Sequence, residues 1–362
     1  MTRLLPELPI DDNVVCSPLS VRLALAMLLP GARGDTREQL AGFLGTDDPA
    51  SLAALYSTLR TDRRRAKAIR LSIANGAFLQ PGFPIFPAYQ EAIEGPFGAL
   101  FENLDFSDSG SAAAHINEWV EKATEGMISN LLSPSMLSQL TSLVLVNAVY
   151  FFAEWEEPFK EHLTRPERFH SVKGAAYDVP MMRQTRFLPY AVDDESGIEA
   201  VRIPYKATSL VVVLPRRGRF AGVAQSFGED HVAGLQFSKR EVELRMPRFE
   251  LESRLSLAGV LSRLGVHVPF NLNRADFGAL TDHPEGLFIE AVEHAARIRV
   301  DEQGTEAAAA TGLRMRALSK SQTRPESLPF HVNRPFLFFV YDHENDCVLF
   351  AGRCTMPKTM GT

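Results

Sequence analysis

The chain has 362 residues, of which 45% are hydrophobic and 23% are charged, and its formal net charge is -6. This composition is typical of a soluble globular protein, and the acidic balance provides no general basic surface for a nucleic-acid partner. No apolar stretch reaches the ~20 residues that cross a membrane, and residues 1–13 lack the apolar core of a signal peptide. We therefore expect no membrane partner and favour a cytoplasmic location.

The first third of the chain predicts helices. Ser17 and Pro18 stand before an apolar-periodic segment, which predicts a helix that is capped by Ser17 and ended by Pro30–Gly31. Residues 111–132 carry an apolar stripe at helical spacing. That stripe predicts one long amphipathic helix.

Strands dominate the rest of the chain. Residues 143–152 form a continuous apolar run that contains one asparagine, and residues 209–214 form another that ends at Pro215. Both runs have the length and composition of buried strands. Near the end, apolar runs at 335–342 and 347–354 flank four turn residues and predict a β-hairpin. Early helices followed by strands predict an α+β fold.

The segment from Val300 to Lys320 contains two competing signals. Its alanines and glutamate favour a helix locally, yet its uncharged residues recur with period two over about thirteen residues, which predicts a half-buried strand. The uncharged positions are Thr305, Ala307, Ala309, Thr311, Leu313, Met315 and Ala317, and the charged ones are Glu306, Arg314 and Arg316. No proline interrupts this segment, so every backbone donor is available for strand pairing.

The sequence contains no motif that indicates an enzyme. It lacks a P-loop, a GxGxxG after a strand, an HExxH and a GxSxG, and its nine histidines lack metal-ligand spacing. Ser17, Asn147 and His294 could form a hydrolase triad. A serine at a helix cap and an asparagine inside a buried strand fit a buried polar network better. We therefore expect no metal, no cofactor and no catalytic residue.

One short basic cluster could bind a polyanion. Its members are Arg63, Arg64, Arg65, Lys67 and Arg70. Asp62 precedes the cluster and the run is short, which favours a solvated helix end over a binding site.

Five motifs between residues 13 and 357 resemble those of the serpins, in the family's order. The segment VDEQGTEAAAAT is similar to the hinge before the serpin reactive-centre loop, and VLVNAVYFFAEWEEPF is similar to the central strand. The other three are NVVCSPLSVRLALAMLLPGARGDTREQL, FHSVKGAAYDVPMM and FHVNRPFLFFVYDHENDCVLFAGRCTMP. Their agreement in order makes the resemblance far more specific than the hinge alone.

The resemblance implies a serpin fold, with three β-sheets, eight or nine helices and an exposed reactive-centre loop at about residues 303–328. It implies that residues 1–362 form one domain, although the length alone would suggest two. The chain departs from the family pattern in two places. Only about a dozen residues precede the first motif, where serpins have a helix, and residues 319–333 form a connection about six residues longer than usual.

The resemblance also implies three sets of site residues. The hinge set is Glu302, Gly304, Thr305, Glu306, Ala307, Ala308, Ala309 and Ala310. The shutter set, where the main sheet parts, is Ser17, Ser20, Asn147 and His294. The breach set, where loop insertion begins, is Trp155, Arg248 and Glu302, of which the last two are a candidate ion pair.

The implied function is inhibition of serine proteases by a monomer that forms a covalent 1:1 complex. In serpins the cleaved bond usually lies fourteen residues after the hinge glycine, which gives Leu318–Ser319 when counted from Gly304. A large apolar residue before the bond suits a chymotrypsin-like or elastase-like protease.

Two alternatives stay open, one for the position of the cleaved bond and one for the inhibitory function. Arg316 or Lys320 would suit a trypsin-like protease, if the long downstream connection shifts the cleaved bond. A non-inhibitory serpin, such as a carrier or folding assistant, would typically have bulky, charged or proline residues in the hinge. The small residues Thr305 and Ala307–Ala310 favour the inhibitor.

Overall fold

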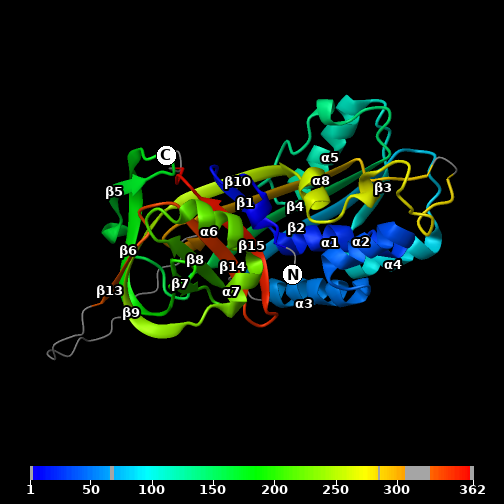
Figure 1. Cartoon of the computed structure of the whole chain (residues 1–362). Coiled ribbons are helices and arrows are strands. Elements are labelled where there is room, and N and C mark those ends of the chain that lie inside the picture. Colours follow the sequence, from blue (N-terminus) through cyan, green and yellow to red (C-terminus); the bar gives the residue numbers. More distant parts are fainter. Residues whose placement is uncertain (1–2, 66–68, 284–285, 306–326, 359–362) are drawn as a thin grey trace.

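The computed structural model describes residues 3–65, 69–283, 286–305 and 327–358, and Figure 1 shows their arrangement. The described strands form two hydrogen-bonded sheets, and the early helices and late strands confirm the predicted α+β class. No helix in these ranges is long and apolar enough to cross a bilayer.

The six-stranded sheet has the order β10-β11-β4-β2-β3, with the short β12 paired to β4. Its strands are β10 (Phe249–Ser256), β11 (Ala291–Val300), β4 (Leu143–Glu154), β2 (Ile69–Leu79), β3 (Leu100–Asn103) and β12 (Gly304–Thr305). Strand β4 confirms the buried strand predicted at residues 143–152. It is central and covered on both faces, which explains why its sequence is apolar throughout rather than alternating.

The nine-stranded sheet has the order β1-β15-β14-β8-β7-β6-β9-β13, with β5 paired to β6. Its strands are β1 (Val14–Cys16), β5 (Arg165–His170), β6 (Ala176–Asp193), β7 (Ile198–Pro204), β8 (Ser209–Pro215), β9 (Ser238–Pro247), β13 (Leu328–His331), β14 (Phe336–Asp342) and β15 (Cys347–Cys354). The buried strand predicted at residues 209–214 is β8, and the predicted hairpin is β14–β15.

The serpin resemblance implies three sheets, whereas the described strands form two hydrogen-bonded sheets. The reason is the long strand β6. Its first part pairs with β5, its middle with β9 and its last four residues with β7. This single strand of 18 residues therefore joins what would otherwise be two separate sheets.

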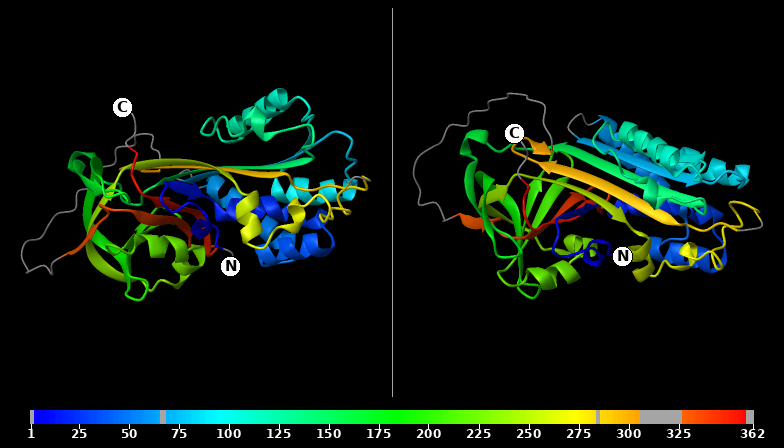
Figure 2. Two further views of the ribbon diagram at one scale, coloured as in Figure 1. Left: turned by 45° about the horizontal axis from the view of Figure 1, so that its top comes forward. Right: turned by 90° about the horizontal axis from the view of Figure 1, so that it is seen from above.

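Eight α-helices lie in the described residues. They are α1 (Pro18–Ala26), α2 (Gly34–Leu44), α3 (Pro49–Arg65), α4 (Pro87–Phe97), α5 (Ser109–Ala123), α6 (Phe220–Ser226), α7 (Glu229–Gly234) and α8 (Ala258–Arg263). Ser17 caps α1 as predicted, because its Oγ accepts a hydrogen bond from the Ser20 N–H at 3.2 Å. Figure 2 shows α5 on one side of the six-stranded sheet and α1 on the other.

Helix α5 is shorter than the sequence predicts. It ends at Ala123, and Glu125 and Gly126 follow with φ angles of 55° and 81°. A right-handed helix cannot continue through two left-handed residues. The prediction of one helix through residue 132 is therefore wrong, and residues 127–132 instead return along the side of α5.

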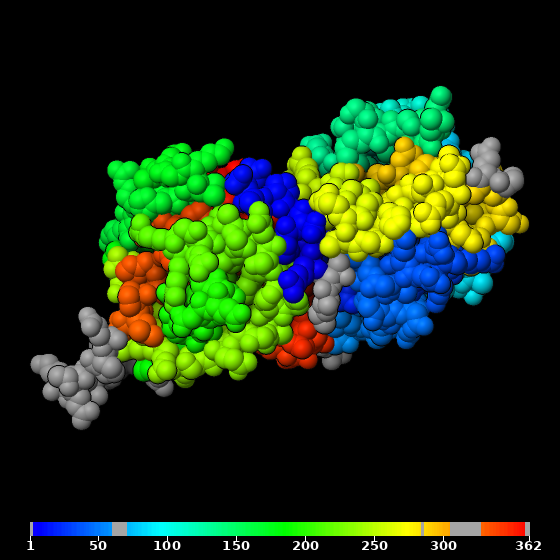
Figure 3. Space-filling model, viewed as in Figure 1, coloured from blue at the N-terminus to red at the C-terminus, as the bar shows by residue number. Residues whose placement is uncertain are grey.

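The segment before β1 crosses the surface of the molecule and is dark blue in Figure 3. Within residues 3–13, Leu5–Glu7 form a 3-10 turn. The buried Leu5 donates its N–H to Glu229 Oε1 at 3.0 Å, and the buried Arg353 donates to the Leu8 carbonyl oxygen at 2.8 Å. These contacts fix the segment against α7 and β15.

Candidate functional site

The candidate site is the seam between β4 and β11. These two strands run parallel and pair directly over residues 144–150 and 291–297. At the other end of β4, residues 304–305 pair antiparallel with residues 153–154 as strand β12. The seam is thus closed along most of its length, while one end already holds the start of an additional strand.

A tight turn brings the chain from β11 into β12. The Asp301 N–H donates to the Gly304 carbonyl oxygen at 2.8 Å. Asp301 Oδ1 accepts from the N–H groups of Gln303 and Gly304 at 3.0 and 3.3 Å. Gly304 has a φ of 147°, and a Cβ atom there would lie 2.1 Å from the Ala153 carbonyl oxygen. Glycine is required at this position because the backbone lies directly against β4.

Trp155 covers the turn at the end of β4. Its side chain is 1% exposed and stacks on Tyr205, with 4.2 Å between ring centroids and 7° between planes. Trp155 Nε1 donates to the Asp301 carbonyl oxygen at 2.8 Å, and the Trp155 N–H donates to the Gln303 carbonyl oxygen at 3.0 Å. The indole ring therefore holds the turn that leads into β12.

Glu302 makes the ion pair with Arg248 that the sequence suggested. Glu302 Oε1 accepts from Arg248 Nε and Nη2 at 2.7 and 2.6 Å, and the Thr164 hydroxyl also donates to it. The carboxylate is 3% exposed, whereas the guanidinium is 33% exposed. A buried carboxylate is costly without its partner, so these donors stabilise the turn beside β12.

Asn147 is the centre of a buried network beneath the seam. Its Oδ1 accepts from Ser20 Oγ at 2.7 Å and lies 2.5 Å from His294 Nδ1. Its Nδ2 donates to Asn75 Oδ1 at 2.5 Å. Asn147 and His294 are also directly paired in the β4–β11 register. The network therefore connects helix α1 with β2, β4 and β11, and separation of β4 from β11 must break it.

The tautomer of His294 follows from its backbone partner. The Ser17 N–H donates to His294 Nε2 at 3.1 Å, so Nε2 is the acceptor and Nδ1 carries the proton that is donated to Asn147. Ser17 Oγ instead donates to the Leu349 carbonyl oxygen at 2.6 Å. The Ser17 hydroxyl is not aligned with the imidazole as a nucleophile would be, and the arrangement fits a buried polar network rather than a hydrolase triad.

Burial lowers the pKa of His294 to about 3. The unfolded chain, with an ordinary histidine pKa near 6.5, binds the proton more readily than the folded chain does. The stability that neutral His294 contributes is therefore complete above about pH 6.5 and is lost progressively as the pH falls toward 3.

We expect the lowered pKa of His294 to reduce the unfolding free energy by about 2 kcal/mol when the pH falls from 7 to 5. Burial raises the pKa of Glu293 to about 7, so that carboxyl acts in the opposite direction over the same range. His294→Gln keeps Glu293 and removes only the imidazole. Urea unfolding at both pH values should show a larger loss for the wild type than for this variant, and equal losses would contradict the assignment.

The structure brings together the described members of each predicted site set. Glu302 lies in the turn that leads into β12, Gly304 is the first residue of that strand, and the shutter residues share one network. Other predicted residues lie outside the described part of the chain: Glu306, Ala307, Ala308, Ala309, Ala310, Arg316, Leu318, Ser319 and Lys320. The side chains of the basic cluster at residues 63–70 also lie outside it.

Three residues of the site are not anticipated by the sequence. Asn75 binds Asn147, Tyr205 stacks on Trp155, and the Asp301 carboxylate forms the turn before β12. Only Asp301 had a local signal, because Asp followed three residues later by Gly is typical of a turn. In the described ranges no group of three or more histidine, cysteine or acidic side chains could hold a metal ion.

Comparisons with known proteins agree along nearly the whole chain. The family model described as serpin (serine protease inhibitor) matches residues 1–357. Ipis-1 of Ixodes persulcatus is 34% identical over 351 residues, which cover 94% of this chain and 91% of that protein. The leukocyte elastase inhibitor of Sus scrofa is 33% identical over 369 residues, covering 98% and 96%. The crystal structure of Serpin48 from Tenebrio molitor matches with a TM-score of 0.87 at 28% identity, covering 98% and 95%. The predicted serpin fold is confirmed, and the chain belongs to the serpin family.

Proposed function

We propose that the chain inhibits chymotrypsin-like or elastase-like serine proteases by trapping them in covalent 1:1 complexes. The main observation is strand β12, because Gly304–Thr305 already pair antiparallel with β4 at the end of the seam. Membership of the serpin family supports protease inhibition, and similarity to the leukocyte elastase inhibitor of Sus scrofa supports an elastase-like target. The apolar Leu318 before the proposed bond suits the same class of protease.

The length of β4 matches the segment that would be inserted. If the register of β12 is continued along the twelve residues of β4, Met315 pairs with Leu143. Thr311 would then lie between Asn147 and His294, which are now paired directly. A strand from Gly304 to Met315 would therefore fill the seam and stop just before the Leu318–Ser319 bond.

In the proposed mechanism the target protease supplies the nucleophile. Its serine oxygen bonds to the carbonyl carbon of Leu318, the Leu318–Ser319 amide bond breaks, and Ser319 leaves as an amine with a proton from the protease's general acid. The released segment then pairs with β4 and β11 and moves the ester-linked protease about 40 Å, at ~3.3 Å per strand residue. Inhibition results when this movement precedes attack of water on the ester.

We expect the chain to form a 1:1 complex with chymotrypsin or elastase that survives boiling in detergent, because the two proteins are joined by an ester. Denaturing electrophoresis checks the complex, and mass spectrometry of the released peptide should give Ser319 as its first residue. A first residue of Ala317 or Ser321 would move the cleaved bond to Arg316 or Lys320. Cleavage by chymotrypsin, elastase and trypsin without any complex would contradict inhibition and favour a non-inhibitory serpin.

A further inference from the structure

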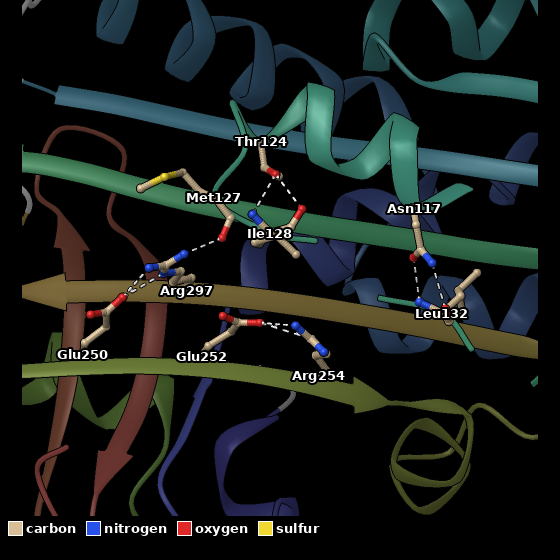
Figure 4. A network of polar contacts seen from close by, with 9 residues as sticks. All are labelled: Asn117, Thr124, Met127, Ile128, Leu132, Glu250, Glu252, Arg254 and Arg297. Atoms are coloured by element: carbon tan, nitrogen blue, oxygen red, sulfur yellow. Dashed lines mark hydrogen bonds and ion pairs between the residues drawn. The ribbon is translucent and has the colours of Figure 1, made fainter. Parts of the chain in front are cut away.

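Helix α5 and the segment that follows it form one unit on the outer face of the six-stranded sheet. Asn117 binds both backbone groups of Leu132, with Oδ1 accepting from the N–H and Nδ2 donating to the carbonyl oxygen, each at 2.8 Å. Thr124 Oγ1 accepts from the Ile128 N–H at 3.1 Å. Figure 4 shows these bonds, which hold residues 124–132 against α5. We call helix α5 with residues 124–132 the α5 unit.

The α5 unit packs mainly on the β2–β4 side of the seam. Its buried side chains form a hydrophobic cluster with residues of three strands. The buried strand residues are Ala74 and Phe78 of β2, Val144, Val146 and Ala148 of β4, and Ala295 of β11, and the partly buried Leu100 of β3 and Ala291 of β11 pack against the same cluster. Apolar packing therefore fixes the unit chiefly to the strands on one side of the seam.

Arg297 connects this unit with the other side of the seam. It lies on β11, and its Nη1 donates to the Met127 carbonyl oxygen at 2.8 Å. Glu250 on the neighbouring β10 orients the guanidinium, since its Oε1 accepts from Arg297 Nε and Nη2 at 2.9 and 2.5 Å. Both side chains are about one quarter exposed. Figure 4 shows the guanidinium between Glu250 and Met127.

Arg297 also lies at the end of the β4–β11 pairing that is nearest to β12. It is the last residue of β11 that pairs with β4, opposite Tyr150, before the strands part toward β12. A strand inserted at this point would move β11 from about 4.8 Å to roughly twice that distance from β4. The 2.8 Å bond from Arg297 to the α5 unit cannot survive that change while the unit stays on β2 and β4.

We propose that Arg297 is a positioning residue that restrains strand insertion by holding β11 to the α5 unit across the seam. This inference rests on the proposed function, because it concerns the insertion step of inhibition. The bond must break early, since continuing the β12 register would place the fourth inserted residue, Ala308, between Tyr150 and Arg297. Arg297 thereby slows premature insertion of the uncut loop and sets the speed of insertion after cleavage.

The test uses insertion of a synthetic peptide, which requires no protease. The peptide TEAAAATGLRMRA, with the sequence of residues 305–317, is incubated with the intact protein, and its incorporation is followed by native electrophoresis and by the combined fluorescence of Trp119 and Trp155. A hydrogen bond between a charged and a neutral group stabilises by roughly a factor of ten or more in an equilibrium constant. We therefore expect about tenfold faster incorporation for Arg297→Gln, a smaller increase for Glu250→Gln and partial restoration for Arg297→Lys.

Arg254→Gln is the matched control. Arg254 pairs with Glu252 at 2.7 Å on β10 alone, on the same sheet face, and that pair does not cross the seam (Figure 4). Incorporation by this variant should stay within about twofold of the wild type. Equal rates for Arg297→Gln and Arg254→Gln, or no incorporation by any variant, would overturn the role of Arg297. The proposed function is judged separately, by the detergent-stable complex of the wild type with a protease.

Discussion

Arginine in place of Thr305 is expected to convert the protein from an inhibitor of its target protease into a substrate. Residue 305 is paired with Ala153, and residues directly opposite each other in an antiparallel ladder share one face of the sheet. Ala153 has no exposed surface and belongs to the larger hydrophobic core. A charge forced onto that face costs several kcal/mol unless it finds a partner, so insertion should stall at its first step.

The Leu318–Ser319 bond lies thirteen residues away, so Thr305→Arg should leave its cleavage unchanged. We expect complete cleavage at the same bond and little detergent-stable complex. More molecules of the variant than of the wild type should be consumed for each protease molecule that is inhibited. Glu306→Arg is the matched control, because the next residue of a strand points to the opposite face. It should inhibit much as the wild type does, and equal behaviour of the two variants would show that the alternating pattern has been assigned to the wrong faces.

Elements with a strong local pattern could be predicted from the sequence. Examples are the apolar run that forms β4, the Ser17 cap of α1 and the β14–β15 hairpin. Each depends on residues that are close in the sequence, and the structural preferences of those residues agree with the fold. The pairing of Glu302 with Arg248 joins residues 54 positions apart. Their opposite charges make them a candidate ion pair in the sequence, but spacing alone carries no information about such a contact, and the family resemblance adds that both belong to the breach.

Features that depend on tertiary contacts could not be predicted. The apolar stripe at residues 111–132 is continuous, yet Glu125 and Gly126 turn the chain back, so that residues 127–132 pack beside α5 instead of extending it. The join of two sheets through β6 depends on which strands its different parts meet. Asn75 joins the network only because β2 pairs with β4 in a register that places it opposite Asn147.

Cleavage within the reactive-centre loop should raise the melting temperature of the protein by on the order of 10 °C or more. In the described part of the chain after β11, residues 304–305 pair with β4, and β4 and β11 pair directly at seven positions. Insertion of a strand through Met315 would replace those pairs with two new ladders, one on each side. At roughly 0.5–1.5 kcal/mol for each net hydrogen bond, a strand of about twelve residues gains on the order of 10 kcal/mol. For a chain of 362 residues, each kcal/mol corresponds to about 1.3 °C at the unfolding entropy typical of globular proteins.

The measurement compares intact protein with protein nicked by limited proteolysis between residues 316 and 320, using circular dichroism during heating. Thr305→Arg provides the control, because it should be nicked equally well but fail to insert, and its nicked form should melt close to its intact form. A nicked wild type that melts at or below the intact protein would mean that the released segment stays outside the sheet. In that case the alternation of charged and uncharged residues over 305–317 would not serve insertion. Trapping of a protease by displacement would also lose its physical basis, because without insertion nothing moves the ester-linked enzyme before water hydrolyses the ester.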